Sequence, residues 1–142
     1  MRGRMEASSS SNDFSSQMNS LLGTIDRIES NITTVSRYHE KALVGVSQDE
    51  TSRITRQLDQ VQDDTNRMMN SVRMTLKKLS EETKRVGGPE AQSRKAQQSS
   101  VAMKLQNAAQ RYAQVQKYAK EQYKKRMERE IRIGKLWHLS LV

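Results

Sequence analysis

The chain has 142 residues, a formal net charge of +9 at pH 7, 34% hydrophobic residues and 4% aromatic residues. So small an apolar fraction argues against an enzyme core with a deep pocket, whereas long helices with one apolar stripe require little more. Cysteine is absent, so disulfides, thiolate metal sites and a cysteine nucleophile are excluded. No apolar run approaches the roughly 18–20 residues of a membrane span, and the chain as given is expected to be soluble and cytoplasmic.

The first helix is predicted over about residues 13–44, after a serine-rich stretch, residues 1–12, that is expected to form a disordered arm. Side chains of the helix recur in alternating steps of four and three, which is the spacing of a coiled-coil stripe. Gly45 is expected to end the helix. The stripe is apolar except at one histidine: Phe14, Met18, Leu21, Ile25, Ile28, Ile32, Val35, His39 and Ala42.

The second helix is predicted over about residues 48–85. Ser47 and Glu50 have the spacing of a capping box, in which each side chain satisfies a free backbone N–H of the other residue. The same alternation of four and three gives the stripe Ile54, Leu58, Val61, Thr65, Met68, Val72, Thr75 and Leu79. A second row lies one position further on and consists of Gln62, Met69 and Leu76.

The third helix is predicted over about residues 89–133, because Pro89 follows two glycines and suits the first helical position. Its stripe is Val101, Leu105, Ala108, Tyr112, Val115 and Ala119, after which the steps become four and four, at Tyr123, Met127 and Ile131. These last turns are expected to face a different neighbour, or none within this chain. Residues 134–142 are expected to form an atypical C-terminal tail that does not belong to the bundle.

Three long helices joined by short turns predict an all-α fold, an antiparallel up-down-up three-helix bundle with coiled-coil-like packing. Eight side chains are predicted to be buried: Ile25, Ile28, Ile32, Leu58, Val61, Met68, Leu105 and Val115.

Catalytic and metal-binding patterns are lacking in the sequence. His39 and His138 are far apart and have no partner at metal-ligand spacing, and no glycine-rich loop follows a strand. We therefore expect no catalytic residue, no metal site and no cofactor, and no enzyme activity.

The basic residues are concentrated near the carboxyl end, with nine basic and three acidic residues between Arg111 and Lys135. A basic helical module that binds an anionic membrane surface is therefore an alternative function. Nucleic acid is a weaker alternative, because single-strand binders present aromatic side chains for stacking and Tyr112 lies on the core stripe.

The segment "SRKAQQSSVAMKLQNAAQRYAQVQKYAKEQYKKRMEREIRI" resembles the third helix of the syntaxin N-terminal regulatory domain. The resemblance includes Arg94, Lys95 and Gln97 at its start, Tyr123 before a basic cluster, and the run Arg129-Glu130-Ile131. Phe14, "IDRIESNITTVSRYHEKAL" and "LDQVQDDTNRMMNSVRMTLKKL" are similar to the corresponding parts of plasma-membrane syntaxins. The resemblance covers residues 13–134 in order.

This resemblance implies a target-membrane SNARE that acts in vesicle docking and membrane fusion (exocytosis) on the cytoplasmic side of the plasma membrane. In that family the three-helix domain holds the SNARE motif in the groove between its second and third helices, and Sec/Munc-family regulators recognise the closed form. The expected partners are therefore SNARE proteins and a Sec/Munc regulator. Carried onto this sequence, the groove is expected to be flanked by Gln62, Met69, Leu76, Lys104, Arg111 and Tyr118.

The family pattern is not followed at either end of the sequence. After Gly134 the chain reads "KLWHLSLV", where a syntaxin would continue into a linker, a SNARE motif and an anchor. We expect that motif and anchor to be missing from this chain, through truncation, an alternative or mispredicted exon, or a cloning scar. The start, "MRGRMEAS", is unlike the short peptide by which some syntaxins bind their Sec/Munc partner.

Overall fold

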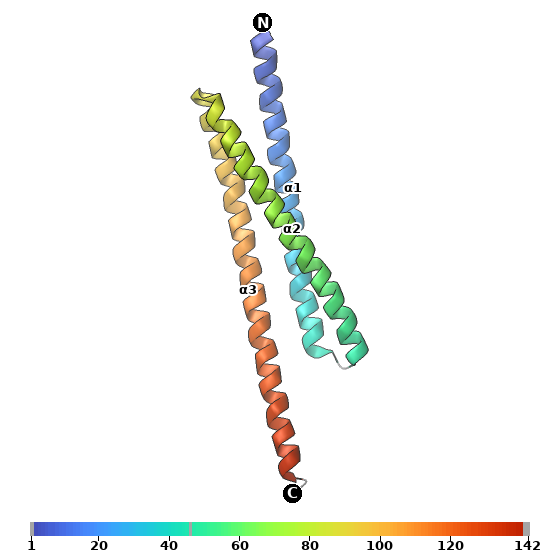
Figure 1. Ribbon diagram of the computed structural model, residues 1–142. Coiled ribbons are helices and arrows are strands. Elements are labelled where there is room, and N and C mark those ends of the chain that lie inside the picture. Colours follow the sequence, from blue (N-terminus) through green and yellow to red (C-terminus); the bar gives the residue numbers. More distant parts are fainter. Residues whose placement is uncertain (1, 46, 141–142) are drawn as a thin grey trace.

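The structure is a computed structural model that describes the backbone of residues 2–45 and 47–140, and the side chains of these residues from Asn12 onward. It consists of three helices, α1 (Arg2–Val44), α2 (Gln48–Val86) and α3 (Gly88–Ser140). They run up, down and up beside one another and form an elongated molecule (Figure 1). No strand occurs in the described residues. The predicted all-α three-helix bundle is confirmed.

Two helices are longer than the sequence pattern predicts. Residues 2–12, expected as a disordered arm, belong to α1, and α3 continues past residue 133 and through Gly134 as far as Ser140. The only proline of the chain is Pro89, so no residue in these stretches blocks a helical backbone. A single glycine costs only about 1 kcal/mol relative to alanine. Leu141 and Val142, the last residues of the predicted tail, lie outside the described residues.

The two turns fall where the glycines are. Ser47 is the N-cap of α2, and its Oγ accepts a hydrogen bond from the Glu50 backbone N–H at 3.2 Å, which is one half of the predicted capping box. At the other turn, Gly87 and Gly88 have φ values of 70° and 67°. Side chains strongly disfavour that region of backbone conformation, which explains why two glycines stand there.

The core is built on α1, whose entire predicted stripe from Phe14 to Ala42 is buried. On α2 and α3, Leu58 and Leu105 are buried as predicted, whereas Val61, Met68 and Val115 are only half-buried. On α2 the roles of two methionines are reversed: Met69, placed in the outer row, is 4% exposed, and Met68 packs at the edge of the core. The buried face of α2 lies between the two predicted rows because α2 packs against both neighbours.

The carboxyl-terminal part of α3 extends beyond the other helices. Figure 1 shows it continuing past the turn between α1 and α2. Tyr123 is half-buried, whereas Met127 and all following described residues are exposed. Of the slipped stripe, Tyr123 still packs against His39 of α1, whereas Met127 and Ile131 are exposed, so the expectation that these turns pack differently holds from Met127 onward.

Candidate functional site

The surface between α2 and α3 is hollowed in two places. The first hollow has a volume of about 310 Å³ and is lined by Arg73 and Leu76 of α2 and by Ala102, Leu105, Gln106 and Ala109 of α3. Leu76 and the buried Leu105 form an apolar floor, and the small side chains of Ala102 and Ala109 keep one wall low. A shallow apolar channel between two helices can accept the apolar face of a third helix.

The second hollow lies where α2 and α3 meet the carboxyl end of α1, near the turn between α1 and α2. Its volume is about 600 Å³, and its apolar lining includes Ala42, Leu58 and Met127. Gln62 of α2 and Tyr123 of α3 also line it. Both hollows lie along α2 and α3, and together we call them the α2–α3 groove.

Two of the six residues predicted to flank this groove line it, namely Gln62 and Leu76. Met69 lies between them in sequence but is buried in the core. Lys104 is exposed and lines neither hollow. The expectation that all six residues flank one groove therefore does not match the structure.

The two remaining residues, Arg111 and Tyr118, face α1 instead of α2. Arg111 Nη1 donates to the Glu29 carbonyl at 3.2 Å, and its Nη2 donates to Thr33 Oγ1 at 2.8 Å. Both residues stand one position before a stripe residue of α3, and that row turns toward α1. The row one position after the stripe, which includes Ala102, Gln106 and Ala109, turns toward α2. The sequence pattern gives both rows but not the side on which each lies.

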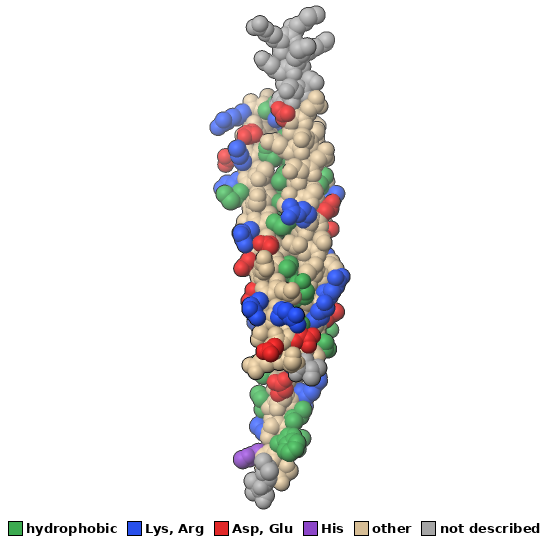
Figure 2. All heavy atoms as spheres, turned by 90° about the vertical axis from the view of Figure 1, so that its right-hand side faces the viewer, with side chains coloured by type: hydrophobic (Ala, Val, Ile, Leu, Met, Phe, Trp, Pro, Cys, Tyr) green, Lys and Arg blue, Asp and Glu red, His purple; other side chains and the backbone are tan. Residues whose placement is uncertain are grey.

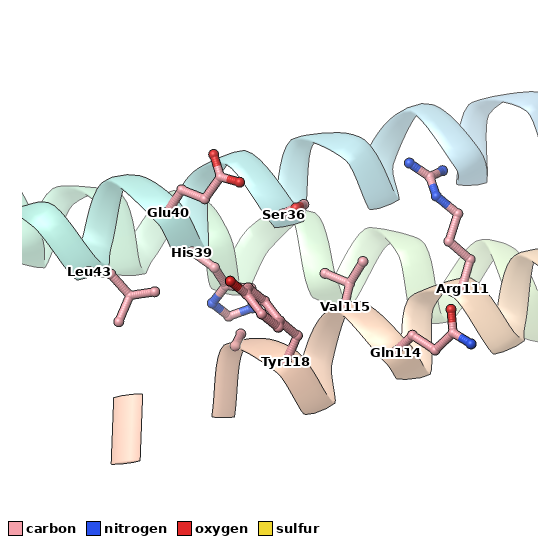
Figure 3. Close-up of a pocket in the computed structure, with 9 residues that line it drawn as sticks. Ser36, His39, Glu40, Leu43, Arg111, Gln114, Val115 and Tyr118 are labelled. Atoms are coloured by element: carbon pink, nitrogen blue, oxygen red, sulfur yellow. The ribbon is translucent and has the colours of Figure 1, made fainter. Parts of the chain in front are cut away.

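Between α1 and α3 the structure has a pocket of about 210 Å³ (Figure 3). Leu43, Val115 and Ala119 supply its apolar lining, and Tyr118, which is 61% exposed, stands at its edge. Arg111 reaches from α3 toward α1, and Glu40 points away from the cavity. The pocket can accommodate a small apolar group.

A polar cluster joins all three helices beneath this pocket. His39 of α1 lies 2.8 Å from Gln116 Oε1 through its Nε2 and 3.1 Å from the Tyr123 hydroxyl through its Nδ1. Gln62 of α2 donates to the same Gln116 oxygen at 3.3 Å, and Gln116 Nε2 donates to the Tyr112 hydroxyl at 3.2 Å. In the tautomer with the proton on Nε2, His39 donates to Gln116 and its Nδ1 accepts from the Tyr123 hydroxyl.

Sequence reasoning identified His39 as a stripe residue but missed this cluster. A usable signal was present, since each of the three helices has a histidine or glutamine on or beside its stripe. Among the described side chains no buried nitrogen or oxygen lacks a hydrogen-bond partner. Burial raises the pKa of the Tyr112 and Tyr123 hydroxyls above the ordinary tyrosine value, because it disfavours the phenolate.

Metal ligands do not gather anywhere in the part of the chain that the structure describes: no three of its histidine, aspartate and glutamate side chains are placed to hold an ion. Within the same residues, no helix has both the length and the apolar character needed to cross a membrane.

Comparison with known proteins gives consistent results. A family model for syntaxin-like proteins matches residues 11–134. The Syntaxin-like protein psy1 of Schizosaccharomyces pombe is 24% identical over 123 residues, which are 86% of this chain and 43% of psy1. This chain therefore spans less than half the length of that relative.

Among solved structures, a chain in the crystal structure of the Unc18–syntaxin 1 complex from Monosiga brevicollis superposes with a TM-score of 0.79 at 25% identity. The superposition covers 92% of this chain and 67% of that one. Because the family match spans most of the sequence and the same three-helix arrangement recurs in this structure, the chain belongs to the syntaxin-like protein family.

Proposed function

We propose that this chain is the N-terminal regulatory domain of a target-membrane SNARE that acts in vesicle docking and membrane fusion. It acts by binding, with the α2–α3 groove holding a SNARE-motif helix. The observation that carries this proposal is the apolar floor of the groove, where Leu76 of α2 and Leu105 of α3 line one hollow together with the small side chains of Ala102 and Ala109.

The architecture of the bundle favours a helical occupant. α2 and α3 pack against each other less extensively than either packs against α1. Ala102 and Ala109 let the backbone of an incoming helix approach closely, and its apolar residues would cover Leu76. Arg73 stands at the rim, so an occupant with an acidic residue beside its apolar stripe would fit best.

A Sec/Munc-family regulator is the second proposed partner. The solved relative with the same fold was crystallised as an Unc18–syntaxin 1 complex, and we carry this kind of partner over to the present chain. In the full-length family form we place the domain on the cytoplasmic side of the plasma membrane, in exocytosis.

The groove can be tested by titrating the isotopically labelled chain with a synthetic SNARE-motif peptide of a related syntaxin and following the NMR amide shifts. We expect the amides of Leu76, Ala102, Gln106 and Ala109 to move together and to saturate. Movement only of amides around the pocket between α1 and α3 would contradict the proposed site.

A matched pair of variants makes the test specific. Ala102→Arg places a long charged side chain in the groove, and Met103→Arg places the same side chain at the next position, where the native methionine is 63% exposed. Ala102→Arg should weaken the peptide at least about ten-fold, equivalent to about 1.4 kcal/mol, whereas Met103→Arg should bind like the parent. Equal affinities of the two variants would refute the assignment.

A further inference from the structure

The last turns of α3 have an unusual surface. Residues 127–140, which we call the distal segment, are exposed throughout. The exposed fractions of its large apolar side chains lie between 48% and 71%: Met127, Ile131, Ile133, Leu136, Trp137 and Leu139. Figure 2 shows apolar side chains close to this end of the molecule, and charged side chains of both signs scattered over the face above it. Isolated exposed apolar residues are ordinary, but a contiguous group marks an interaction surface.

The spacing of these residues produces one continuous face. Ile133, Leu136 and Trp137 follow the i, i+3, i+4 pattern, so they lie side by side on the helix. Arg129 and Arg132 stand four residues before Ile133 and Leu136, so they continue the same face one turn earlier. An apolar patch therefore lies directly beside two guanidinium groups.

The charge of this end of the helix is positive. From Lys124 to Ser140 there are six basic and two acidic residues, and one of the acidic residues, Glu130, pairs with Arg126 at 3.2 Å. The local field therefore attracts an anionic surface.

We propose that the distal segment of α3 docks on an anionic lipid bilayer, with Ile133, Leu136 and Trp137 in the interfacial layer and Arg129 and Arg132 at the lipid phosphates. Tryptophan is enriched at the headgroup level of membranes, and the aliphatic part of an arginine side chain can lie along the apolar layer while its charge stays in water. Helices that combine leucine, tryptophan and basic residues in this way bind membrane surfaces without spanning them.

A bilayer presents phosphates and an apolar layer at one surface, so it can meet the two guanidinium groups and the face of Ile133, Leu136 and Trp137 at the same time. The segment also projects past the turn between α1 and α2 (Figure 1), so a flat surface can reach it. The five residues named in the proposal line neither hollow of the α2–α3 groove, so the proposal does not depend on the function proposed above.

The only tryptophan of the chain, Trp137, is 66% exposed and reports directly on docking. The whole chain is mixed with phosphatidylcholine vesicles that contain phosphatidylserine, or with phosphatidylcholine vesicles alone, and both Trp emission and co-sedimentation are measured. We expect a shift of the emission to shorter wavelength and co-sedimentation with the anionic vesicles only, both reversed by high salt.

Two pairs of variants separate the contributions of charge and apolar contact. Arg129→Gln combined with Arg132→Gln should weaken vesicle binding about 25-fold, because each basic residue near an anionic surface contributes about a five-fold gain. The matched control changes two exposed lysines of α2, Lys77→Gln with Lys78→Gln, and should change binding by less than about two-fold.

Leu136→Ser should weaken binding about ten-fold through the lost apolar contact. Its control is Met74→Ser on α2, a side chain that is 73% exposed, and it should leave binding unchanged.

Three results would overturn the proposal. They are equal binding to the two kinds of vesicle, unchanged binding of the Arg129→Gln/Arg132→Gln variant, and equally tight binding to polyglutamate, which would make the surface a site for acidic protein. A blue-shifted Trp emission without vesicles, together with concentration-dependent association, would point to a second copy of the chain and would also overturn it. The arginine variant should bind the SNARE-motif peptide like the parent, so failure of one proposal is distinguishable from failure of the other.

Discussion

Ile28 of α1 is the side chain at which the energetics of the bundle can be tested most directly. It is 0% exposed and belongs to the core cluster that includes Ile25, Ile32 and Val72. Truncation to alanine removes three carbon atoms, which at about 0.8 kcal/mol each corresponds to roughly 2.4 kcal/mol of lost transfer free energy. The cavity left in a packed core adds a further term, so we expect Ile28→Ala to lower the free energy of unfolding by about 3–4 kcal/mol.

The loss can be measured by urea and thermal unfolding followed by far-ultraviolet circular dichroism. At about 4 °C per kcal/mol for a chain of this size, the midpoint temperature should fall by about 12–16 °C. The control is Ile131→Ala, the same chemical change at a helical position that is 52% exposed, and it should stay within about 0.5 kcal/mol of the parent. Ile28→Asp should be more damaging than either, because it buries an unpaired charge. If Ile28→Ala and Ile131→Ala unfold alike, the assignment of the core is wrong.

Two further predictions concern single polar contacts. Arg126 Nη1 donates to the carbonyl oxygens of Ala42 and Leu43 at 2.9 and 3.0 Å and so caps the end of α1. Arg126→Ala should therefore lower the free energy of unfolding, measured in urea, by about 1–2 kcal/mol. A loss no larger than that caused by Arg129→Ala, at an exposed position, would contradict this role. Because burial raises the pKa of Tyr112 and Tyr123 in the folded state, their contribution to stability is complete below about pH 10 and is lost as the pH rises through the folded-state values. The decline in unfolding free energy above that pH should be shallower in the Tyr112→Phe/Tyr123→Phe variant, and parallel declines would show that burial of the phenols has no such effect.

The periodicity of the sequence was sufficient to predict the buried face of α1, where every stripe residue from Phe14 to Ala42 is buried. This success has a physical reason: α1 faces both other helices with one strict row of large apolar side chains. On α2 the pattern was less reliable, because polar positions such as Thr65 and small shifts between Met68 and Met69 leave two rows with similar apolar content. Packing against two neighbours then selects a face between those rows.

The groove was harder to predict than the fold. The apolar stripe shows which side chains of a helix are buried. The rows on its two sides have the same spacing, so the periodicity does not show which neighbouring helix each row faces. Arg111 and Tyr118 were assigned to the wrong side of α3 for this reason. Ala102 and Ala109, which line the groove, are small residues that carry no distinctive signal in a sequence. The side on which a row lies depends on the hand of the bundle, which periodicity does not encode.

The polar cluster around His39 also sets the axial register of the helices. The apolar stripes are made of similar residues at similar spacing, so a bundle with α3 shifted by one turn, about 5.4 Å, would still bury most of them. The same shift would part His39 from Gln116 and would move Arg126 away from the end of α1. Each buried polar group left unpaired would then cost about 1–3 kcal/mol. The apolar residues hold the helices together, and these few hydrogen bonds fix the axial position of each helix relative to its neighbours.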